Sequence, residues 1–232
     1  REGRFDGHER LLSLLSPQEL GGLLLDDEAP LSLPRIEWLL DQGADPETRV
    51  DGGDTPVFTL LALGHDALPA LQLLLRRGAS PAGAGGLARF LDACAGGDQA
   101  GRALEQCALE LVERGADVFG PSPAGDPPAA LAVRLGWMRL LERLVADGVD
   151  LDQRDGHGMT ALHLAAALAR EPARRLLVKG GASPDVRAAD GQTPLGVALS
   201  AGRRDLADWL DWSGWKLPQR PLRDSDLPAA AM

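Results

Sequence analysis

The chain has 232 residues, 44% of them hydrophobic, which is enough apolar material for one or two domains. Its formal net charge is −10 and lysine occurs only at positions 179 and 216, so a nucleic-acid backbone is not expected as a partner. No apolar run approaches the ~18 residues of a membrane span, which argues against membrane insertion by this segment.

Two further expectations follow from the composition and the first residues. The bias toward Leu, Ala, Gly and Arg is typical of a GC-rich genome and favours a bacterial source. The chain begins at Arg1, without an initiating Met or a signal-peptide pattern. This favours a fragment of a longer or processed protein, and a cytoplasmic location.

Residues 1–46 are expected to form an N-terminal capping repeat. Helical segments are predicted at residues 11–15, 17–25 and 34–41, separated by Pro and Gly. Ser16 and Pro17, followed by Glu19, have the pattern of a helix start, with Ser as the cap and Pro at the first helical position. A capping unit departs from the pattern of internal repeats because one of its faces meets water.

Residues 47–147 are expected to form degenerate repeats. Helices are predicted at residues 90–95, 103–114, 129–135 and 138–146. After Gly78 the Gly-rich stretch 80–86 lacks the usual turn. The next unit has Pro at 121, 123, 127 and 128, and because Pro has no N–H donor, a regular hairpin is not predicted there.

Residues 148–217 contain the clearest repeats. A Gly-rich turn at 155–158 precedes apolar segments at 160–168 and 172–179, and much of this pattern returns at 190–195. Gly158 and Gly191 are 33 positions apart, as are Thr160 and Thr193. A fixed period of this size indicates a stack of repeats.

A glycine recurs at the end of each predicted unit, with successive spacings of 35, 37, 33, 33 and 33. These glycines are Gly43, Gly78, Gly115, Gly148, Gly181 and Gly214. In four units the residue 12 positions later is a Thr or Pro, namely Thr55, Pro127, Thr160 and Thr193. A helix that ends in a left-handed residue favours Gly, so the spacing predicts about six helix pairs, the outermost acting as caps.

These residues resemble the ankyrin repeat, whose pattern is D-x-x-G-x-T-P-L-H-x-A-A followed by a second helix ending L-L-x-x-G-A-D. The best copy has Asp155, Gly158, Thr160, Leu162, His163, Ala165, Ala166, Leu177, Gly181 and Ala182. Ala161 replaces the Pro, Ser183 replaces the last Asp, and the next copy has Gly196 in place of His. The resemblance covers residues 35–214 in phase and 147–210 strongly. It implies an all-α solenoid of about six stacked helix-turn-helix pairs with short finger turns and irregular middle repeats.

Residues 218–232 are predicted to form an extended Pro-rich tail. Trp209, Trp212 and Trp215 recur at every third position and fall on one side of the last helix, where the tail is expected to cover them. The segment from Pro218 to Arg223 matches a loose Pro-rich ligand pattern, which is common by chance.

No catalytic, cofactor or metal site is predicted. The resemblance implies that His163 is a structural residue that hydrogen-bonds within and between turns, and a zinc site from Asp155, His157 and His163 would lack a ligand spacing of its own. Cys94 and Cys107 lie on two helices of one repeat. They are either two buried thiols of a cytosolic protein or, in an oxidising compartment, a disulfide.

The resemblance implies a non-catalytic, monomeric module that binds a protein on its concave face of fingers and inner helices. Its exposed finger positions, carried over by phase, are Asp51, Asp54, Asp155, His157, Met159, Asp190 and Gln192. Their acidity favours a partner with a basic patch, although each Asp is also of a type that caps its own turn. The alternatives are a stand-alone bacterial inhibitor or immunity protein that blocks an enzyme and, least favoured, an enzyme using residues 78–128.

Overall fold

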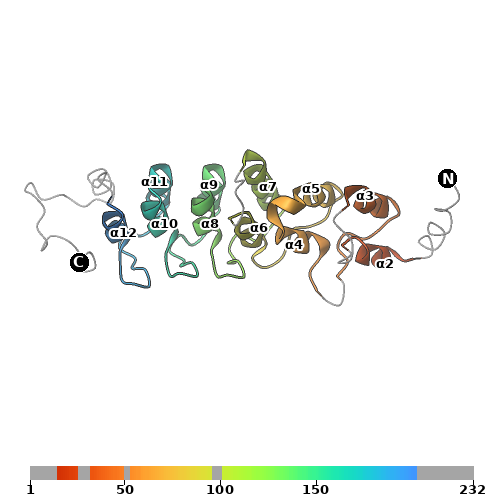
Figure 1. Cartoon of the computed structure of the whole chain (residues 1–232), viewed down its shortest axis with the longest axis horizontal. Helices are drawn as coiled ribbons and strands as arrows, with labels where there is room; N and C mark the ends of the chain where they lie inside the picture. The colour runs from red at the N-terminus through yellow and green to blue at the C-terminus, as the bar shows by residue number, and fades with distance from the viewer. Residues whose placement is uncertain (1–14, 26–31, 50–52, 96–100, 203–232) are drawn as a thin grey trace, which may run out of the picture.

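The structure of the chain is a computed structural model, which describes residues 15–25, 32–49, 53–95 and 101–202 (Figure 1). Its helices are α2 (Pro17–Gly22), α3 (Leu33–Asp41), α4 (Pro56–Leu61), α5 (Leu68–Arg76), α6 (Gly86–Ala95), α7 (Arg102–Glu113), α8 (Pro128–Leu135), α9 (Met138–Ala146), α10 (Ala161–Ala167), α11 (Glu171–Lys179) and α12 (Pro194–Ser200). A short 3-10 helix, η2 (Gly64–Ala67), precedes α5. The only β structure in these ranges is one bridge between Arg154 and Thr160.

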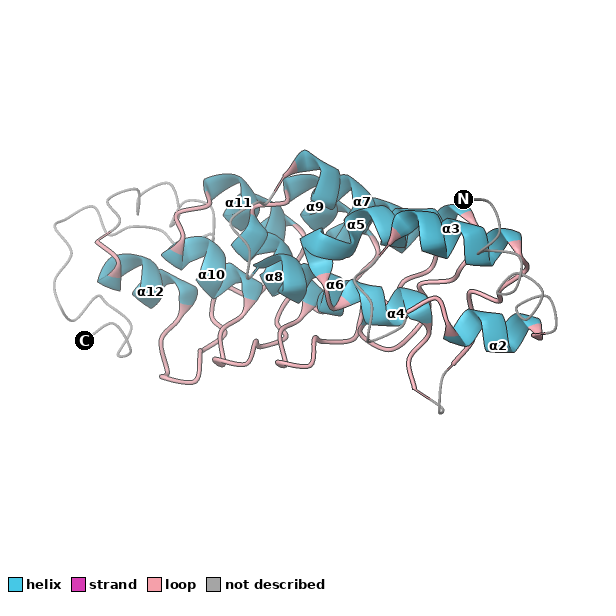
Figure 2. Cartoon of the chain, turned by 45° about the vertical axis from the view of Figure 1, so that its right-hand side comes forward, coloured by secondary structure: helices cyan, strands magenta, loops and turns pink. Residues whose placement is uncertain are grey.

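The helices stack in two rows along an elongated molecule (Figures 1 and 2). In the inner row, α4, α6, α8, α10 and α12 each contact the next helix, and in the outer row α3, α5, α7, α9 and α11 do the same. In the inner row, α4, α6, α8 and α10 also pack against the outer helix that follows each of them, and α2 packs against α3 in the same way. The predicted all-α solenoid of stacked helix pairs is therefore confirmed, with five complete pairs and α12 within the described ranges.

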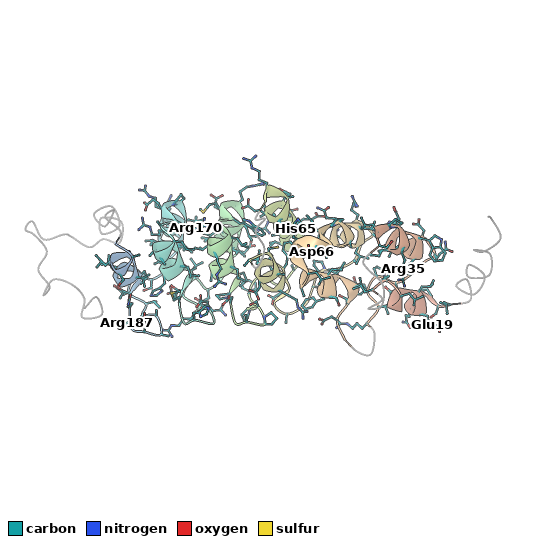
Figure 3. All side chains as sticks on the ribbon, viewed as in Figure 1. Glu19, Arg35, His65, Asp66, Arg170 and Arg187 are labelled. Carbon is teal, nitrogen blue, oxygen red and sulfur yellow. The ribbon has the colours of Figure 1, made fainter. Side chains whose placement is uncertain are left out.

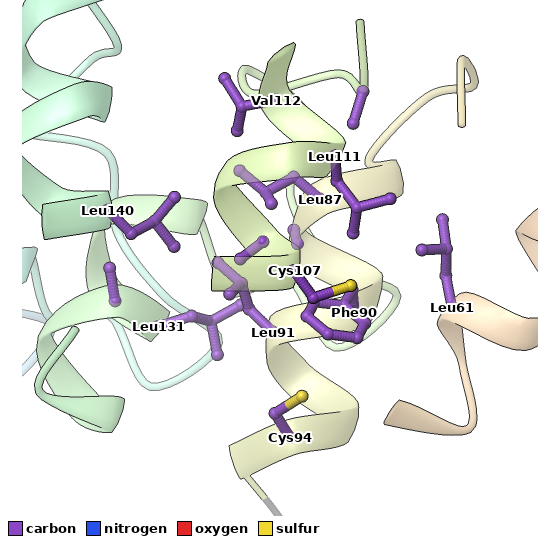
Figure 4. Packing of buried hydrophobic residues seen from close by; sticks show 14 of the residues in the cluster. Leu61, Leu87, Phe90, Leu91, Cys94, Cys107, Leu111, Val112, Leu131 and Leu140 are labelled. Carbon is purple, nitrogen blue, oxygen red and sulfur yellow. The ribbon is translucent and has the colours of Figure 1, made fainter. Parts of the chain in front are cut away.

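One hydrophobic core runs along the stack. Inner helices are enclosed on several sides, and in α10 six of the seven residues are buried, which explains its Ala-rich composition with no polar face. The middle of the core is seen in Figure 4, where Phe90 and Cys94 of α6 lie beside Cys107 and Leu111 of α7.

The predicted closing glycines adopt the left-handed conformation. Gly43, Gly78, Gly115, Gly148 and Gly181 have φ between 77° and 101°. A Cβ added at any of these five would meet nothing within 4 Å, so backbone conformation alone, and not lack of space, requires Gly. Gly214, the Trp residues at 209–215 and the tail at 218–232 lie outside the described residues.

The predicted start of one helix in the middle is wrong. The sequence predicts a helix from residue 90, whereas α6 begins at Gly86. Gly85 has φ +68° and turns the chain directly into the helix, so the Gly-rich stretch is not a long loop.

The expected irregular turn at the Pro-rich segment is also wrong. The N–H of Ser122 donates to the Asp126 carbonyl at 2.9 Å, and the N–H of Gly125 donates to the Ser122 carbonyl at 2.8 Å. The equivalent bonds in the next repeat, from Asp155 to Met159 and from Gly158 to Asp155, are both 2.8 Å. The four prolines occupy positions whose N–H groups this turn does not use, so the hairpin forms despite them.

Candidate protein-binding face

Between each closing glycine and the next inner helix lies a segment that we call a finger. Finger 2 is residues 44–55, finger 3 is 79–85, finger 4 is 116–127, finger 5 is 149–160 and finger 6 is 182–193. Fingers 4, 5 and 6 project on one side of the stack, before α8, α10 and α12 (Figures 1 and 2). The projecting loops and the inner helices beside them form the candidate binding face.

Fingers 4, 5 and 6 are joined to one another by hydrogen bonds. The Asp126 carboxylate of finger 4 accepts from the Gly156 N–H of finger 5 at 2.9 Å. Finger 5 is joined to finger 6 by the Ala189 N–H, which donates to the Gly158 carbonyl at 3.2 Å. The Arg154 guanidinium also donates to the carbonyl of Arg187, at 2.9 Å, and Arg187 lies on the finger side in Figure 3. These three fingers therefore form one ordered block.

His163 has the structural role that the resemblance implies. It is fully buried, its Nδ1 accepts from the Thr160 N–H at 3.2 Å, and its Nε2 donates to the Gln192 carbonyl at 3.0 Å. This pattern requires the neutral tautomer with the proton on Nε2. Burial lowers the pKa of His163 below its ordinary value, and the hydrogen bond to Gln192 only partly opposes this.

Asp155 is not an exposed finger residue, contrary to the expectation from phase. It is buried, and its Oδ1 accepts from the N–H groups of His157 at 3.0 Å and Met159 at 2.8 Å. Its Oδ2 lies 3.5 Å from Nη2 of Arg134, whose Nη1 is 2.9 Å from the Asp126 carboxylate. Asp155 therefore holds the turn of finger 5, and Arg134 of α8, which the sequence did not single out, bridges two fingers.

The other predicted binding positions differ in exposure. Asp54, His157 and Asp190 are exposed, on fingers 2, 5 and 6, whereas Met159 and Gln192 are half-buried. Met159 packs against the core. The Asp190 carboxylate also accepts from the Gln192 N–H at 2.9 Å, which is the turn-capping role that the sequence left open. Asp51 lies outside the described residues.

Finger 3 is clearly shorter than the others. The other four fingers are equal in length, whereas α6 already begins at Gly86, soon after the closing Gly78. The short loop is held by Asp117, whose carboxylate accepts from the Gly85 N–H at 2.7 Å and the Phe119 N–H at 2.9 Å. Burial raises the pKa of Asp117, but bonds from Gly85, Phe119 and Gly120 outweigh it and lower the pKa below its ordinary value.

A cavity of about 310 Å³ lies where finger 3 is shortened. Its walls are Asp54 of finger 2 with α4 on one side, the short finger 3 with α6, and finger 4 on the other side. The lining residues are Asp54, Phe58, Ala84, Gly85, Arg89, Pro121, Ser122 and Pro123. Nη1 of Arg89 is 2.7 Å from Oδ2 of Asp54, and its guanidinium carbon is 4.9 Å from the centre of the Phe58 ring. Of this cavity, the sequence predicted only Asp54 as a binding residue.

Within the described ranges, no group of three or more His, Cys, Asp and Glu residues is placed to hold a metal ion. None of the helices described is both long and apolar enough to cross a membrane. Cys94 and Cys107 are free and buried, and burial raises the pKa of each thiol to about 12, so both are protonated at neutral pH.

Comparison with known proteins identifies the repeats. The family model for ankyrin repeats in three copies matches residues 129–211. Human SH3 and multiple ankyrin repeat domains protein 2 is 28% identical over 212 residues, which is 76% of this chain and 11% of that protein. The E3 ubiquitin-protein ligase Ufd4 of Drosophila melanogaster is 34% identical over 122 residues, 50% of this chain and 4% of that protein. A putative ankyrin repeat-containing protein of Treponema pallidum (strain Nichols) is 40% identical over 82 residues, 35% of this chain and 27% of that protein. This chain thus spans 27% or less of the length of each of these relatives.

Proposed function

Because this chain belongs to the ankyrin repeat family, whose repeats generally mediate protein–protein interaction, we propose that it binds a protein partner through its fingers and inner helices. One observation carries the proposal. Fingers 4, 5 and 6 are joined by bonds from Asp126 to Gly156 and from Gly158 to Ala189, while the side chains of His157 and Asp190 remain exposed. A surface that is already ordered loses little conformational entropy when a partner binds.

The net charge of the chain favours a basic partner. On the face itself, the exposed carboxylates of Asp54 and Asp190 lie among exposed arginines, and Arg154 and Arg187 keep their charge while each donates to a finger carbonyl at 2.9 Å. The net charge of −10 produces a long-range field that attracts a positively charged surface. This attraction acts mainly on the association rate, so the interaction weakens as salt rises.

The relatives support a module within a longer protein over a stand-alone inhibitor of an enzyme. Each of the three matched proteins is several times longer than the region shared with this chain. The inhibitor alternative would instead require one tight partner that is an enzyme and loses activity when bound.

An affinity experiment tests the face with a matched control. The chain is immobilised and used to capture proteins from its native cell lysate, alongside a finger variant that carries His157→Arg and Asp190→Lys. The control carries Glu113→Gln and Glu142→Lys, exposed positions on the outer helices α7 and α9, and gains the same positive charge.

Proteins captured by the wild type and the control, but not by the finger variant, are the expected result. Equal capture by all three chains would place the binding site elsewhere. Absence of any specific capture by the wild type would count against a protein-binding role. Inhibition of a captured enzyme by the purified chain would support the inhibitor alternative.

A further inference from the structure

We propose that the cavity at the shortened finger 3 is a subsite for one arginine or lysine side chain of the protein partner. The inference rests on the proposed function and adds a location and a chemical class to it. It is carried by three features of the cavity: its size, the charge at its mouth and the apolar surface of finger 4.

The cavity has the size of a side-chain site. Its volume of about 310 Å³ is at the lower end of the roughly 300–1,000 Å³ that small-molecule sites occupy. The shape is fixed by local packing. A Cβ at Gly83 would overlap the Phe58 ring, and a Cβ at Gly85 would overlap the Pro121 carbonyl oxygen. Finger 3 therefore approaches both walls as closely as the backbone allows.

The Asp54 carboxylate at the mouth of the cavity can accept a second cation, although it already pairs with Arg89. The side chain of Asp54 is 44% exposed and that of Arg89 is 26% exposed, with one face of the guanidinium against Phe58. Oδ2 of Asp54 takes the bond from Arg89, and within the described ranges Oδ1 has no hydrogen-bond donor. Because a carboxylate accepts several bonds at once, Asp54 can bind a second cation while keeping Arg89.

Finger 4 is apolar at two positions where the equivalent fingers are charged. Phe119 and Pro121 occupy the positions of Asp152 and Arg154 in finger 5 and of Asp185 and Arg187 in finger 6. Phe119 is 61% exposed, although burial of an aromatic ring is normally favourable.

The aromatic residue at 119 also replaces a structural acceptor. Asp152, its equivalent, accepts from the Ser183 N–H of the next repeat at 2.9 Å, and Glu47 in finger 2 accepts from the Ser80 N–H at 2.6 Å. Phe119 has no group that can accept the corresponding bond. An exposed ring that replaces a bond between repeats is better explained by contact with a partner than by stability.

A long basic side chain fits both parts of this site. Its aliphatic stem would lie along Pro121 and Pro123, and its charged head would reach Asp54. An acidic side chain would instead face Asp54 in a chain whose net charge is −10. A purely apolar side chain would remove water from the Asp54–Arg89 pair without replacing the lost hydrogen bonds.

The test selects peptides from a library of random short peptides displayed on phage, with the wild-type chain as the target. Dissociation constants of the selected peptides are then measured by fluorescence anisotropy for the wild type, Asp54→Asn and Ala84→Trp. Asp54→Asn removes the charge, and Ala84→Trp fills the cavity from an exposed position. Glu142→Gln, at an exposed position on the outer helix α9, is the matched control, and Asp190→Asn on finger 6 tests the rest of the finger face. Thermal melts of each variant establish that it is folded.

The expected peptides share an arginine or lysine, and replacing that residue by Gln weakens binding. Losing one charge-assisted hydrogen bond weakens binding by roughly tenfold or more, so Asp54→Asn and Ala84→Trp should show this loss, and Glu142→Gln should not. The subsite is refuted if the selected peptides lack a basic residue, if they bind both cavity variants normally, or if no peptide is selected. Peptides that lose affinity only with Asp190→Asn would refute the subsite while supporting the finger face, so the two proposals fail separately.

Discussion

Replacing Leu177 by Ala tests whether neighbouring repeats share one core. Leu177 of α11 is fully buried, and α11 packs against both α9 and α10. The substitution removes three carbon atoms, which at about 0.8 kcal/mol each amounts to ~2.4 kcal/mol of lost transfer free energy. Incomplete closure of the resulting cavity adds about 1 kcal/mol, so we expect a loss of about 3–4 kcal/mol in the free energy of unfolding.

The assay is urea denaturation followed by far-UV circular dichroism. Leu168→Ala is the matched control, because Leu168 directly follows α10 in the same repeat but is 45% exposed, and it should change stability by only about 0.5 kcal/mol or less. Because each repeat is stabilised by its neighbours, the loss at Leu177 should lower the midpoint of the whole transition. Equal midpoints for the two variants would show that Leu177 is not part of a shared core.

Two further predictions concern hydrogen bonding and backbone conformation. The pKa of His163 is lower in the folded chain than its ordinary value of about 6.5, so below about pH 6.5 the unfolded chain binds more protons. The stability due to neutral His163 should be complete above this pH and decrease by at most about 1.4 kcal/mol per pH unit as pH falls toward the folded pKa. Urea midpoints from pH 7.5 to 5.5 should show this for the wild type and less of it for His163→Gln, and an identical pH dependence would refute it. An Ala at Gly85 or Gly148 costs about 1–2 kcal/mol for its left-handed backbone, but only Gly85→Ala also places a Cβ against the Pro121 carbonyl oxygen. Gly85→Ala should therefore lower the melting temperature more than Gly148→Ala, and the reverse order would show that finger 3 can move away.

The fold was predictable because its main signals are local and repeated. At positions such as Gly148 and Gly181, the left-handed backbone of that residue alone requires Gly. Because these glycines recur at a regular spacing, they mark the end of each repeat in the sequence. The start of α6 was not predictable in this way, because it depends on a contact between repeats. The Gly85 N–H, just before α6, donates to the Asp117 carboxylate, which belongs to the next repeat.

The candidate site was predictable only in part. The position of a residue within the repeat correctly indicated exposed side chains at His157 and Asp190. It could not show that Asp155 turns inward to accept from two N–H groups of its own finger. The cavity depends on Asp54, Arg89 and Pro121, which belong to three different repeats. One signal was present in the sequence: the Gly-rich stretch 80–86 after Gly78 lacks the usual turn of a finger.

The junctions between fingers also bear on how an array of this kind changes length during evolution. From finger 4 to finger 6 the units recur at a constant interval, and the finger turns at 122–126, 155–159 and 188–192 use the same backbone hydrogen bonds. Duplication or deletion of a whole unit there would join surfaces that already fit. The junction between fingers 3 and 4 has no counterpart in the described chain, because the contact of Gly85 with Asp117 and Gly120 occurs once. We therefore expect related chains to gain or lose repeats on the C-terminal side of finger 4 and to keep the shortened finger at a fixed distance from it.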